Sequence, residues 1–204
     1  MTGIGTYIDL VNPYKFRETI ERETAVDNPT GVFINAFILA SLSVLLALAM
    51  SYAQNAKIGI YSLSLSPQAY NHGGTPLDIA VTFCIALFST FITPFVFNGM
   101  AKLLGGDGSF WKVAWPQTSI SVVYSLVSIP PMALALLISA YVYCVVMIPL
   151  FVGSIYTYYL FYKIIRASHK SLSRNKAIAT IIAGTILAIA IFGAIQMVRA
   201  LYGI

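Results

Sequence analysis

Charge is scarce in this sequence. Asp, Glu, Lys and Arg together make up only 9% of its 204 residues, whereas apolar residues make up 58%. A soluble domain carries about 25% charged residues, so this chain has too few charges to cover a surface in water. The excess of apolar side chains must face lipid, and the chain is therefore predicted to be an integral membrane protein. This composition excludes most soluble enzyme folds, disordered tails and disulfide-stabilised scaffolds.

Cysteine and histidine are also rare, with two of each. Cys84 and Cys144 both lie in apolar runs, so a disulfide framework is not expected. His72 and His169 fall in segments that we predict on opposite sides of the membrane, so they cannot share a metal ion. The sequence contains no H-E-x-x-H motif, no pair of catalytic carboxylates and no Ser/His/Asp or Cys/His set. We therefore predict that the protein is not an enzyme and has no cofactor.

Charged residues are absent from the centres of the apolar stretches. Ionisable groups inside the bilayer usually mark proton or ion pathways, so their absence argues against an ion-coupled pump. It does not argue against a passive pore. The polar residues expected at depth, mostly near the ends of spans, are Asn35, Thr93, Asn98, Gln117 and Gln196.

Five segments are long enough to cross a membrane, which takes about 20 apolar residues in a helix. The predicted spans cover residues 32–53, 79–101, 113–129, a part of 132–162, and 177–198. Spans three and four share a charge-free stretch of about 50 residues between Lys112 and Lys163. Pro130 and Pro131 predict the turn between them, because proline fits poorly inside a helix. The predicted fold is all-α, a polytopic membrane protein of five transmembrane helices with a short N-terminal interfacial helix.

Basic residues set the expected orientation. One side of the five-span arrangement carries Lys15, Arg17, Arg22, Lys102, Lys112, Lys163, Arg166, Lys170, Arg174 and Lys176, and the other carries Lys57 and Arg199. Segments rich in Lys and Arg stay in the cytoplasm, so the N-terminus is predicted to be cytoplasmic and the C-terminus extracytoplasmic, in the cell membrane. Residues 1–31 then form a cytoplasmic segment, 32–198 a single transmembrane domain, and 199–204 an extracytoplasmic tail.

The N-terminal segment contains one helix signal. Asn12 is suited to cap a helix and Pro13 to its first position. Phe16 and Ile20 follow four residues apart, on one helix face, among charged residues. This pattern predicts a short amphipathic helix that lies along the inner leaflet.

Two features of the spans concern helix packing. Ala179, Ala183, Ala190 and Ala194 share one face of span five, where small side chains let backbones approach closely. The contact could lie within one protomer or between protomers. Pro94 and Pro149 lie within spans two and four and are expected to kink them.

Four motifs, in order along nearly the whole chain, resemble the Yip family, the Ypt/Rab-interacting multi-pass membrane proteins. They are LVNPYKFRETIERE, LLGGDGSFWKVAW, SIPPM and RASHKSLSRNKAI. The residues that carry the resemblance are Pro13, Phe16, Gly105, Gly106, Gly108, Phe110, His169, Ser171 and Lys176. The resemblance implies five helices and a cytoplasmic N-terminus. Eukaryotic members are linked to vesicle trafficking and Rab-type GTPases, but this chain lacks their long cytosolic N-terminal domain and looks like a short prokaryotic-type member, so only the fold is carried over.

The leading functional hypothesis is a non-enzymatic membrane scaffold or accessory subunit that acts through helix–helix and lipid contacts. The alternative is a small-solute channel or transporter that uses the proline-kinked spans two and four. Expected partners are membrane lipids and either further copies of the chain or a membrane complex, with no nucleic acid, because the positive charge flanks the membrane. The candidate cytoplasmic interaction face comprises Pro13, Phe16, Ile20, Gly105, Gly106, Gly108, Phe110, Trp111, Arg166, His169, Lys170 and Arg174.

Overall fold

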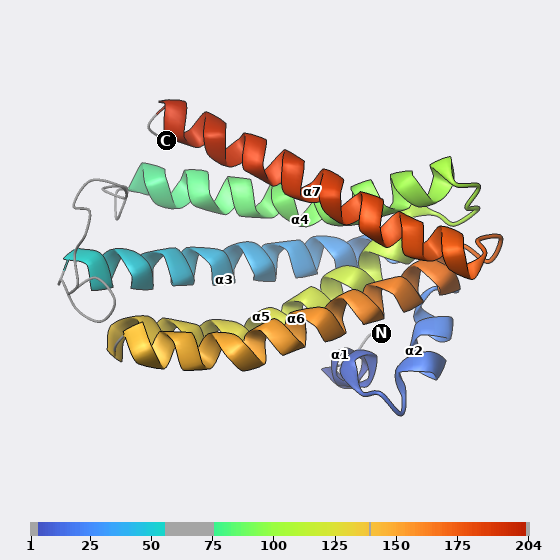
Figure 1. Cartoon of the computed structure of the whole chain (residues 1–204), viewed down its shortest axis with the longest axis horizontal. Coiled ribbons are helices and arrows are strands. Elements are labelled where there is room, and N and C mark those ends of the chain that lie inside the picture. Colours follow the sequence, from blue (N-terminus) through green and yellow to red (C-terminus); the bar gives the residue numbers. More distant parts are fainter. Residues whose placement is uncertain (1–3, 56–75, 139, 203–204) are drawn as a thin grey trace.

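The computed structural model describes residues 4–55, 76–138 and 140–202, and every regular element in these ranges is an α-helix. In chain order the helices are α1 (Ile4–Val11), α2 (Phe16–Glu23), α3 (Pro29–Asn55), α4 (Pro76–Leu103), α5 (Phe110–Ile138), α6 (Ala140–Ser168) and α7 (Arg174–Tyr202) (Figure 1). The predicted outer loop with Lys57 and His72 lies outside the described residues, as do the side chains of Gln196 and Arg199.

The five long helices confirm the predicted fold class. Helices α3 to α7 contain between 27 and 29 residues each. At a rise of 1.5 Å per residue, a helix of that length is about 40 Å long, enough to cross the hydrocarbon core and both headgroup regions. All five are apolar enough to be membrane spans. Their lipid-facing sides carry exposed large apolar residues, such as Phe37, Phe88 and Ile148.

The boundary between spans three and four differs from the predicted one. Pro130 and Pro131 lie inside α5, which continues to Ile138, so they do not form the turn. A turn at that depth would expose several unpaired backbone groups to hydrocarbon, whereas a proline inside the helix removes one N–H donor. The longer helix is therefore the better solution within a membrane. Pro149 likewise lies inside α6, which is continuous from Ala140 to Ser168.

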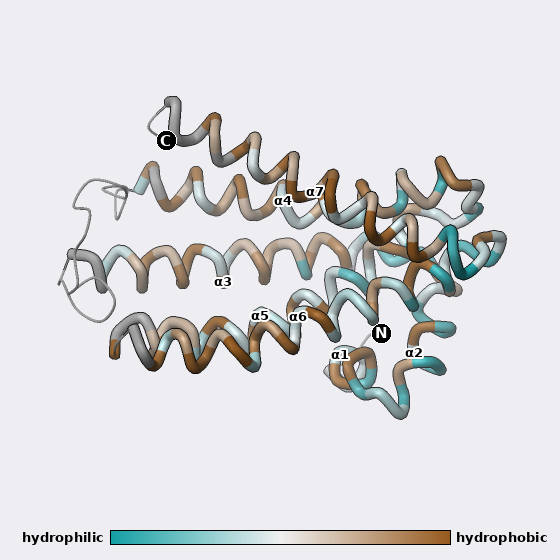
Figure 2. Tube along the Cα trace, in the orientation of Figure 1, coloured by the Kyte–Doolittle hydropathy of each residue, from teal (hydrophilic) through white to brown (hydrophobic). Residues whose placement is uncertain are grey.

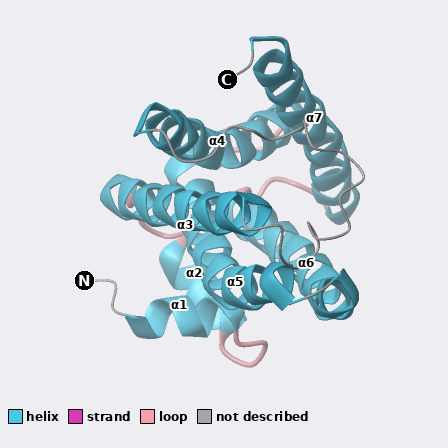
Figure 3. Ribbon diagram, turned by 90° about the vertical axis from the view of Figure 1, so that its left-hand side faces the viewer, coloured by secondary structure: helices cyan, strands magenta, loops and turns pink. Residues whose placement is uncertain are grey.

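The helices surround α3 and α5. Helix α3 packs against α4 on one side and α5 on the other, and α5 also packs against α6. Helix α7 lies along α4 and contacts α6 where the two are joined (Figures 1 and 3). The links 104–109 and 169–173 lie at one end of the molecule, together with α1 and α2. We call it the loop-side end, and Figure 2 shows that hydrophilic residues concentrate there.

The N-terminal segment differs from the prediction in two ways. A first helix, α1, precedes the predicted one, and α2 begins at Phe16 because Asn12 organises a turn before it. The Asn12 carbonyl accepts the Phe16 N–H at 2.8 Å, and its Oδ1 accepts the Tyr14 N–H at 3.0 Å. In addition, Phe16 and Ile20 are only 5% and 3% exposed. They are buried against the protein, in the apolar cluster that includes Leu10 and residues of α5 and α6, and not in lipid.

Candidate interaction site

The link between α4 and α5 depends on glycine. Gly105 has φ of 95°, a left-handed conformation that glycine adopts without strain. The Gly106 N–H bonds to the Ala101 carbonyl at 2.8 Å, and the Gly105 N–H bonds to the Lys102 carbonyl at 3.0 Å. This pair of bonds closes the last turn of α4 and reverses the chain. The glycine-rich segment noted in the sequence is therefore a helix terminator that directs the following residues toward the link 169–173.

His169 forms the centre of this site. Its side chain is fully buried, and its Nδ1 accepts the Gly108 backbone N–H at 2.8 Å. The ring is thus neutral, with its proton on Nε2. Burial is the main cause that lowers the pKa of His169 below its ordinary value of 6.5; the charge of Asp107 opposes this shift and that of Lys102 adds to it. Nε2 has no hydrogen-bond partner among the described residues.

Gly106 and Gly108 make room for the imidazole. A Cβ added to Gly106 would lie 2.5 Å from His169 Nδ1, and one added to Gly108 would lie 2.9 Å from His169 Cε1 and would overlap the Ser168 carbonyl. Real Cβ atoms do not approach this closely. The three glycines therefore have separate roles: one provides the turn, and two allow the ring to contact the backbone.

Further hydrogen bonds join the two links into one unit. Ser171 Oγ lies 2.8 Å from the Gly105 carbonyl and 3.0 Å from Asp107 Oδ1, and the Ser171 N–H donates to the same carboxylate at 3.4 Å. These bonds lower the pKa of Asp107. The Ser168 hydroxyl donates to the Lys112 carbonyl at 3.1 Å. We call residues 104–109 and 168–173 the glycine–histidine unit.

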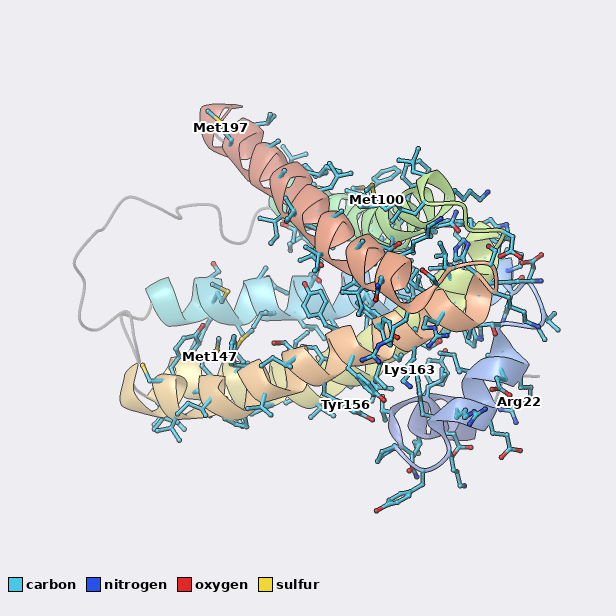
Figure 4. The ribbon with its side chains drawn as sticks, turned by 45° about the vertical axis from the view of Figure 1, so that its right-hand side comes forward. Arg22, Met100, Met147, Tyr156, Lys163 and Met197 are labelled. Carbon is cyan, nitrogen blue, oxygen red and sulfur yellow. The ribbon has the colours of Figure 1, made fainter. Side chains whose placement is uncertain are left out.

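The N-terminal helices are bonded to the same end of the bundle. Trp115 Nε1 donates to Glu23 Oε2 at 2.9 Å, Ser109 donates to Asp27, and the Tyr156 hydroxyl donates to the Val11 carbonyl at 3.2 Å. Figure 4 shows Tyr156 of α6 with the charged side chains, including Arg22 and Lys163, gathered toward this end. The two short helices are therefore held in place and do not lie free on the surface.

A buried polar network continues this connection into the bundle. Asn35 of α3 is fully buried; its Oδ1 accepts the Tyr7 hydroxyl at 2.7 Å. Its Nδ2 donates to Thr118 Oγ1 at 3.0 Å and to Ser119 Oγ at 2.9 Å. All partners of this amide come from α1 and α5, so it joins three helices. The sequence places Asn35 at depth, but no local pattern predicts partners more than 80 residues away.

The residues of the predicted interaction face all lie at the loop-side end but differ in exposure. The buried ones are Phe16, Ile20, Gly108 and His169, and the half-buried ones are Gly106, Phe110 and Trp111. The exposed ones are Pro13, Gly105, Arg166, Lys170 and Arg174. The buried set builds the site, and the exposed set is what another molecule can touch.

The three exposed cations Arg166, Lys170 and Arg174 form no ion pair in the described part of the chain. Three other cations of this end do form ion pairs, namely Lys15 with Asp9, Arg17 with Glu21 and Arg22 with Glu23. The first three charges are thus directed to whatever lies outside the protein. The described residues contain no group of three His, Cys, Asp or Glu side chains suited to a metal ion.

The predicted packing face of α7 is mostly turned outward within this chain. Ala183 is half-buried, and Ala179, Ala190 and Ala194 are exposed. The contact with α4 uses a neighbouring face through Gly184, where an added Cβ would overlap the ring of Phe97. Sequence reasoning missed Gly184 because it selected alanines by their spacing, and the relevant signal was the glycine that directly follows Ala183.

Comparison with family models gives a match over residues 9–195, nearly the whole chain, to the family described as Yip1 domain. This range includes the glycine–histidine unit, the first four spans and most of the fifth. No curated protein and no solved structure matches the chain significantly.

Proposed function

We propose that this chain, which belongs to the Yip1 domain family and has five helices suited to span a membrane, is a non-enzymatic scaffold or accessory subunit. It acts at its loop-side end, where it binds anionic lipid headgroups and a protein partner. The observation that carries this proposal is the group of three exposed, unpaired cations beside a hydrogen-bonded platform. We call Arg166, Lys170 and Arg174 the basic triad.

The platform supports this function because it fixes where the charges lie. Arg166 is in the last turn of α6, Lys170 is in the glycine–histidine unit, and Arg174 begins α7. The intervening His169 is held by Gly108, so the three side chains start from defined backbone positions. A scaffold needs such a preorganised surface, since ordering a loose loop on binding would weaken the interaction.

The membrane setting supports the choice of lipid. The loop-side end carries ten of the twelve basic residues, which favours a cytoplasmic position for it. The cytoplasmic leaflet is the anionic one, and each basic residue near its surface contributes about 1 kcal/mol of attraction. The basic triad therefore matches the surface that it would face. The exposed alanine face of α7 favours self-association as a further part of the scaffold role.

The test compares two triple variants with the same change in net charge. In the first, Arg166, Lys170 and Arg174 are replaced by Gln; in the second, Lys15, Arg17 and Arg22 are replaced by Gln. Both proteins are purified in mild detergent, and thermal unfolding is followed while phosphatidylserine or phosphatidylcholine is added. We expect phosphatidylserine to stabilise the wild type and the second variant, but not the first, which lacks the basic triad.

The same preparations reveal protein partners. Partners that co-purify with the wild type and the second variant, and are lost from the first, support the basic triad as the binding surface. If lipid stabilisation and every co-purifying protein survive in the first variant, the proposal is wrong.

The competing hypothesis is a small-solute channel or transporter, and one observation favours it: Pro94 of span two lines a cavity within the bundle whose lining includes several hydroxyl groups. A coupled transporter normally has an ionisable group at its midplane, and the span sequences contain none there. We therefore expect no proton- or sodium-driven uptake of solutes in liposomes. Gradient-driven uptake would favour the transporter over the scaffold.

A further inference from the structure

A cavity of about 290 Å³ lies between α3, α4, α5 and α6. Its lining is rich in hydroxyl groups, and none of its lining residues is charged. A water molecule occupies about 30 Å³ in the liquid, so the space is equivalent to about ten waters. Its size lies near the lower end of the range for small-molecule pockets. Most of the lining surface is nevertheless apolar, and the polar groups are spread over it, so the cavity suits an occupant that has both apolar carbon and hydroxyl groups.

Gln117 gives the strongest indication that the occupant of the cavity carries polar groups. Its side chain lines the cavity and is only 2% exposed. Neither its Nε2 nor its Oε1 has a hydrogen-bond partner among the described residues. An unpaired buried amide is unfavourable, and a helix can accommodate leucine there at no such cost. The amide therefore offers a donor and an acceptor to a ligand.

The neighbouring hydroxyls narrow the chemistry of that ligand. Thr90, Ser121, Ser154 and Thr157 each donate their proton to a backbone carbonyl of their own helix. Their oxygens can then only accept further hydrogen bonds. A ligand that supplies several O–H donors fits this lining. An ion does not, because no charge balances it in the cavity.

The position of the cavity indicates access from the membrane. Gln117 lies seven residues after the start of α5, which places it about 10 Å below the loop-side end of that helix. That depth is just beneath the headgroup region of a bilayer. Tyr158, which also lines the cavity, is 42% exposed, so the cavity reaches the outer surface of α6.

We propose that this cavity binds an uncharged glycerol-like group that carries free hydroxyls. Such a group can come from a neutral lipid, as the two hydroxyls of a monoacylglycerol, or from a soluble polyol. In either case Gln117 exchanges hydrogen bonds with the hydroxyls, and the oxygens of Thr157 and its neighbours accept from them. This binding site is independent of the basic triad at the surface.

The test uses the purified full chain in detergent with two photoreactive probes. One is a diazirine-labelled monooctanoylglycerol, and the other is a diazirine-labelled glycerol without acyl chains. We expect labelling of α5 and α6 peptides that excess unlabelled monooctanoylglycerol prevents and trioctanoylglycerol, which has no hydroxyl, does not. Labelling by the acylated probe assigns the site to a lipid, and labelling only by the glycerol probe assigns it to a soluble polyol.

Variants separate a binding role from a structural one. Gln117→Leu should reduce labelling about tenfold, the equivalent of a buried hydrogen bond, without lowering the thermal stability of the ligand-free protein. Thr157→Val, which keeps the shape and removes an acceptor, should also reduce it and serves if the first variant does not fold. Ser89→Ala is the matched control and should label like the wild type, since the Ser89 hydroxyl bonds to the Ala86 carbonyl outside the cavity.

Three outcomes would overturn the proposal. They are competition by trioctanoylglycerol, labelling that is unchanged in both cavity variants, and no labelling of these helices by either probe.

Discussion

The neutral state of His169 makes the stability of the protein depend on pH. Burial lowers the pKa of this side chain in the folded protein below the ordinary value of 6.5, which the unfolded chain keeps. As the pH falls through 6.5, the unfolded state therefore gains a proton that the folded state does not. The free energy of unfolding decreases until the pH passes the folded-state pKa. We predict that the unfolding temperature in detergent falls between about pH 7 and about pH 5.

Two histidine variants identify the group responsible. His169→Asn offers an acceptor to the Gly108 N–H but does not titrate, so its unfolding temperature should vary much less over this pH range. His72→Asn removes the other histidine and should retain the wild-type slope. If His169→Asn keeps the full pH dependence, another group causes it.

The glycine–histidine unit makes a second prediction at the residue scale. Gly106→Ala places a methyl group against the imidazole of His169 and should lower the free energy of unfolding by about 1–3 kcal/mol, as overpacking does. Gly99→Ala is the control, because no atom lies within 4 Å of its added Cβ. In the interior of α4 that change should be neutral or stabilising by up to about 1 kcal/mol. Equal effects of the two substitutions would show that the contact with His169 is unimportant for stability.

At the scale of the helices, a contrast within α7 tests its packing. Gly184→Ala should destabilise the protomer, because the methyl group would overlap the ring of Phe97 and push α7 away from α4. Gly193→Ala meets nothing within 4 Å and should not. Thermal unfolding of the two purified variants measures the difference. A stable Gly184→Ala protein would mean that α7 can shift freely against α4.

The exposed alanines of α7 predict a different effect. Ala190→Leu should leave the thermal stability of the protomer unchanged, since this residue is exposed within the chain. It should reduce the size of the oligomer, because a bulky side chain separates backbones that meet through small residues. Size-exclusion chromatography with light scattering measures this, with Ile189→Leu as a control on an exposed neighbour. An unchanged oligomer would indicate that the alanine face contacts lipid.

The helices show which features a sequence can predict. The five spans follow from hydropathy, because lipid imposes a length and an apolar composition on each of them. The prediction of a turn at Pro130 and Pro131 is wrong, because both residues lie inside α5. The propensity of proline to end helices is measured in water, where a freed carbonyl can bond to solvent. The orientation of Phe16 also could not be predicted, since an apolar helix face fits lipid and a protein core equally well.

The site required information about the whole molecule. The sequence placed the glycine-rich link and the segment around His169 in one interaction face, but their direct contact depends on how α4, α5, α6 and α7 end at the same level. The same is true of Gln117, which the sequence placed at depth without a role. Its lack of partners becomes visible only once the four helices around it are in place.

The orientation of the whole molecule in the membrane is the last prediction. The two links, α1 and α2 share the loop-side end, and α7 leads from it to the opposite end, so the region around Lys170 and the last turn of α7 lie at opposite ends of the bundle (Figure 1). Ten of the twelve basic residues belong to the loop-side end, which we therefore expect to be cytoplasmic. A reporter inserted after Lys170 should be active only in the cytoplasm, and one fused after Ile204 only outside it. A reporter fused before Met1 is the control and should agree with the one at Lys170. If the reporters at Lys170 and Ile204 are active on the same side, α7 does not cross the membrane and the basic triad loses the orientation that its proposed function requires.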